Sequence, residues 1–163
     1  MAEPKTTTRT RILDGALELF ATSGLLNTSV DQIARTVGVR KANIFYYFPT
    51  RDDLAVAALE RVEAITLRQL SETEDPVALL FGDEVGVSHD MCCWLRIMAQ
   101  TPFLTDGLQA RAQESMVTVH KLLAPRLGAD AAWGVLTAAM GLGSLPDNQS
   151  RLNARTWHIS AQK

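Results

Sequence analysis

The residues best suited to binding chemistry lie close together in the segment 40–47. It carries two cations, one amide and two phenols, namely Arg40, Lys41, Asn43, Tyr46 and Tyr47. An asparagine amide can read adenine through two hydrogen bonds, and lysine favours guanine or phosphate. Tyrosine can donate to phosphate oxygens or pack on thymine methyls and sugars. These residue types on one short helix predict an element that reads a DNA groove. The alternative is a three-helix bundle whose cations are only solvated.

Two helical patterns around a glycine turn would position this segment. Ser29 and Gln32 form the signature of a capping box, and an apolar face then runs to Gly38. A third helix over about 41–48 follows the turn and is closed by Pro49. Its packing against the second helix should use a small apolar core of Val30, Ile33, Val37, Val39, Ile44 and Phe48. Two further groups are expected to reach phosphate: Thr28 and Ser29 at the start of the second helix, and Arg51 at the start of the fourth.

The rest of the chain has helical spacing almost throughout. A first helix should end at Gly24 in the left-handed conformation, and a fourth should run from a Thr50–Asp53 cap to about residue 70. Beyond the linker 71–76, helical patterns follow near 76–85, 91–100, 108–123 (ending before Pro125) and 131–142, with a weak last segment from 146. No strand pattern with a period of two appears. The sequence predicts an all-α protein, with a helix-turn-helix DNA-binding domain at 1–51. A long helix joins it to a helical ligand-binding and dimerisation bundle at 52–163.

Charge is unevenly distributed along the 163 residues. Residues 1–51 hold seven lysines and arginines against four acidic residues, whereas the whole chain has a net charge of -2. A basic head on an acidic body is expected of a protein that touches phosphate at one end only. The only cysteines are adjacent, no apolar leader is evident, and no apolar run is long enough for a membrane span. We therefore expect a soluble, cytoplasmic protein with no membrane partner.

As a set, the residues of segment 11–54 resemble the N-terminal DNA-binding domain of the TetR family of bacterial transcriptional regulators. The resemblance rests on Ile12, Leu13, Ala16, Leu17, Phe20, Gly24, Thr28, Ile33, Ala34, Gly38, Val39, Phe48 and Leu54. It implies a homodimer that binds a palindromic operator, usually as a repressor, and that a small-molecule effector releases from DNA. By position, it also implies DNA contacts at Thr28, Arg40, Lys41, Asn43, Tyr46, Tyr47 and Arg51.

Four positions depart from the family pattern. Phe45 stands where tyrosine is preferred, so one hydroxyl for phosphate is missing. Ala42 replaces a common glycine, and Arg51 replaces the usual lysine but keeps its charge. Gly15 stands where alanine is usual, which should cost the first helix about 1 kcal/mol.

Large apolar side chains and one histidine in the body are candidates for an effector cavity. They are Phe81, Cys92, Trp94, Met98, Phe103, Met116 and His120, with Met91 and Ile97 as further candidates. The alternative for each of them is ordinary core. The small residues of segment 131–141 suit either a symmetric dimer interface or packing within the chain.

No catalytic constellation, cofactor motif or convincing metal site appears in the sequence, so we expect no enzyme and no cofactor. The main hypothesis is a ligand-responsive, sequence-specific repressor. One alternative is an interaction protein that keeps the fold but has lost operator binding. Another is a thiol-redox sensor or enzyme that uses Cys92 and Cys93, against which stands the simpler interpretation of both as buried small hydrophobic residues.

Overall fold

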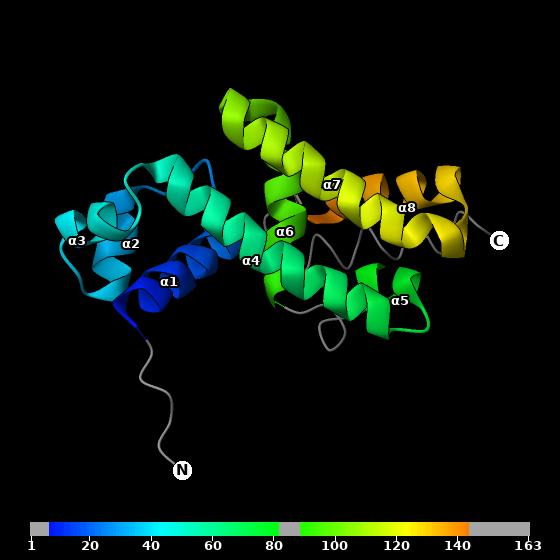
Figure 1. The fold of residues 1–163 in the computed structure, drawn as a ribbon, viewed down its shortest axis with the longest axis horizontal. Helices are drawn as coiled ribbons and strands as arrows, with labels where there is room; N and C mark the ends of the chain where they lie inside the picture. The colour runs from blue at the N-terminus through cyan, green and yellow to red at the C-terminus, as the bar shows by residue number, and fades with distance from the viewer. Residues whose placement is uncertain (1–6, 82–88, 144–163) are drawn as a thin grey trace, which may run out of the picture.

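A computed structural model describes residues 7–81 and 89–143, and every regular element in these ranges is helical (Figure 1). The elements are α1 (Thr8–Ser23), α2 (Val30–Val37), α3 (Lys41–Tyr47), α4 (Arg51–Glu72), α5 (Pro76–Phe81), α6 (His89–Gln100), the 3₁₀ turn η1 (Thr101–Phe103), α7 (Asp106–Leu127) and α8 (Ala129–Gly143). The predicted all-α fold is confirmed. The weak helix expected beyond residue 146 lies outside the described residues.

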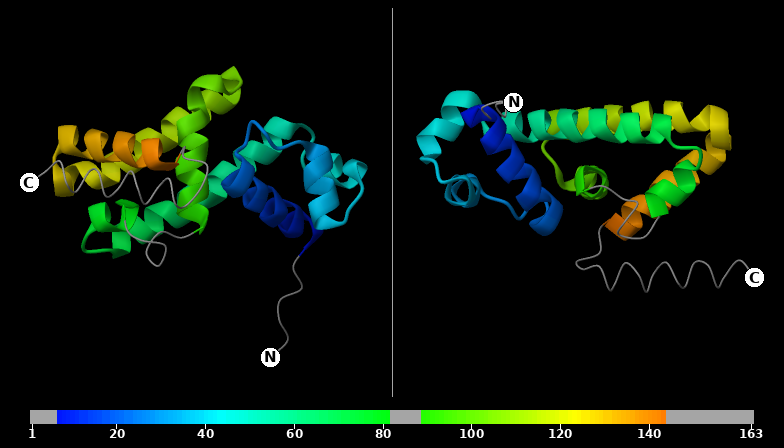
Figure 2. Two further views of the ribbon diagram at one scale, coloured as in Figure 1. Left: turned by 180° about the vertical axis from the view of Figure 1, so that it is seen from behind. Right: turned by 90° about the horizontal axis from the view of Figure 1, so that it is seen from below.

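Helices α1, α2 and α3 form a head at one end of the molecule, and α4 runs from this head into the body (Figures 1 and 2). In the body α4 packs on α6 and α7, while α8 packs on α6 and α7. Helix α6 also contacts α1, so head and body share a packed boundary. No helix within the described residues is both long and apolar enough to cross a membrane.

Local capping signals define the helices of the head. Both predicted capping boxes are present: Ser29 with Gln32 begins α2, and Thr50 with Asp53 begins α4. Gly38 ends α2 in the left-handed conformation, with φ 72° and ψ 39°. Gly24 ends α1 differently from the prediction, because its φ of 83° is combined with a ψ of 154°, an extended conformation open essentially to glycine alone.

The core of the head holds α3 against α2 as expected. Ile33, Ile44 and Phe48 are almost fully buried, and Val37 and Val39 are half-buried against them.

Gly15 is needed for the packing of α1 on α2, although glycine has a low helix propensity. A Cβ atom at this position would overlap with the Val37 side chain, so the glycine allows α1 and α2 to approach closely.

The predicted end of α7 before Pro125 is wrong, because the helix continues through this proline to Leu127. A proline removes one backbone hydrogen bond and strains the preceding turn. Tertiary contacts of the next residue offset that cost. The Arg126 guanidinium donates to the carbonyl oxygens of Leu70 (2.8 Å), Thr73 (2.6 Å) and Glu74 (2.9 Å), which ties the last turn of α7 to the end of α4.

Candidate nucleic-acid interface

Helix α3 presents most of its polar residues to solvent. Arg40, Lys41 and Asn43 are exposed, as is Tyr46, whose exposed fraction of 81% is far above that of the neighbouring side chains. Tyr47 is half-buried and packs edge-to-face against Tyr46, with ring centroids 5.0 Å apart. The polar side chains that the sequence predicted for the DNA interface therefore lie together on the surface of α3, while Ile44 packs into the core on the opposite side of the helix.

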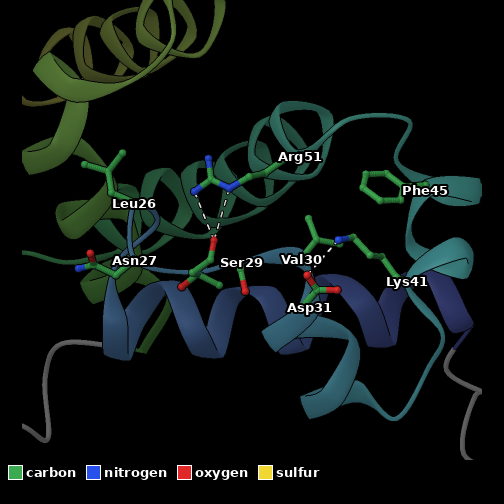
Figure 3. A pocket seen from close by; sticks show the side chains of 9 residues that line it. Leu26, Asn27, Ser29, Val30, Asp31, Lys41, Phe45 and Arg51 are labelled. Carbon is green, nitrogen blue, oxygen red and sulfur yellow. Dashed lines mark hydrogen bonds and ion pairs between the residues drawn. The ribbon is translucent and has the colours of Figure 1, made fainter.

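A pocket of about 410 Å³ lies between α3, the start of α2 and the start of α4 (Figure 3). Its lining comprises Leu26, Asn27, Thr28, Ser29, Val30, Asp31, Lys41, Phe45 and Arg51. An ion pair lies at its side, with Lys41 Nζ 2.9 Å from the Asp31 carboxylate. Phe45 is 39% exposed and contributes an apolar ring where a tyrosine would add a hydroxyl.

Thr28 does not offer its hydroxyl to a ligand, which corrects the sequence prediction. The residue is only 3% exposed, and its Oγ1 donates to the carbonyl oxygen of Gly24 at 2.8 Å. Threonine here satisfies a buried turn carbonyl. Ser29 is exposed as expected, but its backbone N–H donates to Gln32 Oε1 at 2.7 Å within the capping box. A phosphate would therefore have to compete with Gln32.

Arg51 is turned toward the protein and is half-buried (Figure 3). Its Nη2 donates to the carbonyl oxygen of Leu25 at 2.5 Å, and Nη2 and Nε both lie 3.4 Å from the carbonyl oxygen of Thr28. The guanidinium thus joins the start of α4 to the loop before α2. The sequence indicated a phosphate contact here and missed this internal role, because carbonyl partners leave no signature in side-chain chemistry.

Two basic residues of α1 also make internal contacts. The Arg9 guanidinium lies 4.9 Å from the centroid of the Phe48 ring, and Arg11 Nη2 donates to the carbonyl oxygen of Val37 at 3.0 Å. Both side chains remain exposed, so they still contribute to the positive potential of the head.

Two contacts near the boundary between head and body have no signal in the sequence. Gln100, the last residue of α6, accepts a hydrogen bond from the backbone N–H of Leu26 at 3.2 Å. Its amide also fills the space beside Gly24, which a Cβ atom there would occupy. Thr105 Oγ1 donates to the Asp52 carboxylate at 2.6 Å. The loop before α2 is therefore held both by α4, through Arg51, and by α6.

Residues 12–58 match the family model described as bacterial regulatory proteins, tetR family. Residues 12–58 thus form a DNA-binding domain of the TetR type. The matched region spans α1 to α3 and the first part of α4, which includes the residues of α2 and α3 discussed above.

Curated relatives agree with this assignment over part of the chain. The HTH-type transcriptional regulator RutR of Escherichia coli K12 is 38% identical over 109 residues, which cover 60% of this chain and 51% of RutR. SrpR of Pseudomonas putida is 32% identical over 82 residues, which cover 50% of this chain and 33% of SrpR. The matches thus span about half the length of RutR and a third of SrpR.

Solved structures show the same fold over almost the whole chain. The reduced form of E. coli NemR superimposes with a TM-score of 0.68 at 16% identity, covering 91% of this chain and 93% of NemR. A TetR transcriptional regulator from Legionella pneumophila gives 0.62 at 22% identity, covering 96% and 91%. At these identities the likeness concerns the fold alone.

The body of the chain contains a second pocket, of about 510 Å³. Its lining comes from α6, η1, α7 and α8 and comprises Met98, Ala99, Thr101, Pro102, Gln113, Met116, Met140 and Gly141. Thr101 is 6% exposed, and within the described residues its Oγ1 has no hydrogen-bond partner. Of the seven predicted effector residues, Met98 and Met116 line this pocket.

The other five predicted effector residues lie elsewhere. Trp94 is buried in the core and donates to Ser115 Oγ at 2.9 Å, and Phe103 is 74% exposed. His120 stacks on Trp133 at 4.2 Å, with a ring nitrogen 3.0 Å from the carbonyl oxygen of Ala129. Cys92 and Phe81 are half-buried outside the lining. Sequence spacing placed these side chains on helices but could not show which way each helix faces.

The buried thiol of Cys93 does not suit nucleophilic chemistry. Burial, reinforced by the negative charge of Asp90, raises the pKa of Cys93 to about 12. Because the thiolate is the reactive form, a thiol with this pKa stays protonated and inert at neutral pH. In the described part of the chain, no three histidine, cysteine, aspartate or glutamate side chains are grouped so that they could hold a metal ion.

Proposed function

We propose that this protein is a sequence-specific DNA-binding transcriptional regulator. One observation carries the proposal: a TetR-family helix-turn-helix unit presents Arg40, Lys41, Asn43 and Tyr46 at its surface. Asn43 supplies a bidentate amide for a base edge, whereas the cations and the phenol suit phosphate. In this proposal residues 1–51 form the DNA-binding domain and residues 52–163 the ligand-binding and dimerisation domain.

The protein would act as a homodimer on a palindromic operator, with one α3 helix in each of two successive major grooves. The outer surface of α8 supports this part of the proposal. Ala131, Gly134 and Thr137 are exposed at helical spacing and are all small, so that a second copy of α8 could approach closely.

We further propose that the body pocket binds a small effector and that binding releases the operator. Among the described residues, no charged side chain lines the pocket, and the buried hydroxyl of Thr101 leaves a hydrogen bond to be made, so a neutral, largely apolar ligand fits best. The segment that provides Met98 and Thr101 also includes Gln100, which contacts Leu26 ahead of α2. A ligand that shifts this segment would thus shift the head.

The test of DNA binding requires no known operator. Duplexes are selected from a random pool with the purified protein, and fluorescence anisotropy then compares the selected duplex with a scrambled one across a salt titration. The proposal predicts preference for the selected duplex and a steep loss of affinity with salt, because each phosphate contact releases counterions. Equal binding to both duplexes with a salt slope near zero would instead favour the interaction protein.

A further inference from the structure

The ion pair between α2 and α3 lies on the surface that the proposed function turns toward DNA. Lys41 Nζ and the Asp31 carboxylate are 2.9 Å apart, and their side chains are 50% and 62% exposed (Figure 3). Both residues line the pocket beside Ser29. Because the pair is open to solvent, an incoming phosphate can reach the lysine and compete for it.

The two cations in the described lining of this pocket, Lys41 and Arg51, have different kinds of partner. Arg51 donates to backbone carbonyls, which cannot leave without disturbing the loop. Lys41 is paired with an exposed carboxylate, and such pairs contribute little to stability. Among the lining residues, Lys41 is therefore the cation that can be transferred to DNA at low structural cost.

We propose that Asp31 is an internal competitor of DNA for Lys41, and that it limits how tightly the head binds duplexes of any sequence. The inference rests on the proposed DNA-binding function. In the free protein the Asp31 carboxylate forms an ion pair with the Lys41 ammonium group. When DNA binds, Lys41 moves to a phosphate, and Asp31 stays close to the polyanion without its partner.

This competition affects all DNA sequences alike, because phosphate contacts carry no sequence information. Asp31 thus lowers absolute affinity and leaves the preference between sequences unchanged. Its effect should also depend on salt. Binding of Lys41 to phosphate releases counterions from DNA, while the abandoned carboxylate takes up a cation, so the two contributions partly cancel.

The test compares Asp31→Asn with Asp14→Asn in anisotropy titrations on a fluorescein-labelled random-sequence duplex and on a duplex selected from a random pool. Asp14 is a matched control, because it also forms an exposed ion pair, with Arg61 at 2.6 Å, but lies outside the pocket. At low salt, Asp31→Asn should bind both duplexes about two- to fivefold tighter per head, as expected for release of one surface pair. The magnitude of its salt slope should rise by up to about 0.9 per head. Asp14→Asn should change affinity by clearly less.

A Lys41→Ala background separates competition for the lysine from simple repulsion of DNA. If Asp31 acts through Lys41, most of the gain from Asp31→Asn disappears in that background. An equal gain with and without Lys41, equal effects of the two asparagine variants, or weaker binding by Asp31→Asn would each overturn the inference. If the wild-type protein shows no salt-dependent binding to either duplex, the proposed DNA-binding function fails as well. Circular dichroism melts establish that all variants are folded.

Discussion

Replacing Arg51 tests whether the start of α4 mainly stabilises the head or mainly contacts DNA. Arg51→Lys keeps the charge, which would preserve a phosphate contact, but an ammonium group cannot reproduce the planar fork of donors. In the structure that fork serves the carbonyl oxygens of Leu25 and Thr28. The lysine variant should therefore lose stability even though its charge is unchanged.

The expected loss follows from the geometry of these bonds. The contact to Leu25 is the close one of the three, whereas the two at 3.4 Å to Thr28 are beyond the usual range and count for little. A hydrogen bond to a charged donor contributes about 1.5–3 kcal/mol. Because Arg51 is half-buried, we expect Arg51→Ala to lower the free energy of unfolding by about 2 kcal/mol, and Arg51→Lys by about half as much.

Urea unfolding followed by circular dichroism measures this difference. With a slope of about 2 kcal/mol/M, the alanine variant should unfold at a urea concentration about 1 M lower than wild type. Arg35→Ala is a suitable control, since Arg35 is an exposed arginine in α2 whose removal should change stability by less than about 0.5 kcal/mol. If Arg51→Lys is as stable as wild type while Arg51→Ala weakens DNA binding, the phosphate contact expected from the sequence is the correct role.

Three further substitutions test particular contacts. Gly15→Ala should destabilise the protein by about 1–3 kcal/mol despite alanine's better helix propensity, because the new methyl group overlaps with Val37; a more stable variant in urea would contradict the close α1–α2 packing. Gly24→Ala should cost about 1–3 kcal/mol from backbone strain alone. Adding Gln100→Ala should remove only the steric overlap between the new methyl group and the Gln100 amide. If the double variant regained the full stability of wild type, backbone strain at position 24 would be excluded. Asn43→Ala should weaken binding to a selected duplex by about 1–3 kcal/mol and leave a scrambled duplex nearly unaffected, whereas equal losses in anisotropy would exclude base readout.

The parts of the fold that sequence predicted well depend on local interactions. Both capping boxes join residues three apart, and the glycine turn expected after α2 is present at Gly38. The apolar spacing of α2 and α3 likewise identified Ile33, Ile44 and Phe48 as core. Pro125 shows where this reasoning fails. Its intrinsic preference favoured a helix end, but three contacts from Arg126 to residues more than fifty positions away keep the helix intact.

The candidate sites divide in the same way. Exposed side chains of α3 could be assigned from chemistry and spacing, because a short helix against a small core has one free side. In the body, no local signal shows that Phe103 is exposed while Met98 and Met116 meet at a pocket, since that depends on how α6, α7 and α8 pack. Residue type can thus nominate a pocket residue, but only packing decides whether it faces the pocket.

The loop before α2 illustrates why an interface residue cannot be assigned from residue type alone. Thr28 and Arg51 both have groups that bind phosphate well, and both use them on backbone carbonyls of residues 24–28. These carbonyls belong to a turn with little regular backbone hydrogen bonding, in which the Leu25 carbonyl also accepts the backbone N–H of Thr28, and side chains supply further donors. A threonine or arginine next to such a turn therefore turns inward, while the side chain of Asn43, on helix α3, is exposed. The demand of the neighbouring backbone for hydrogen bonds, as much as the chemistry of the side chain, determines which polar residues of the head can face DNA.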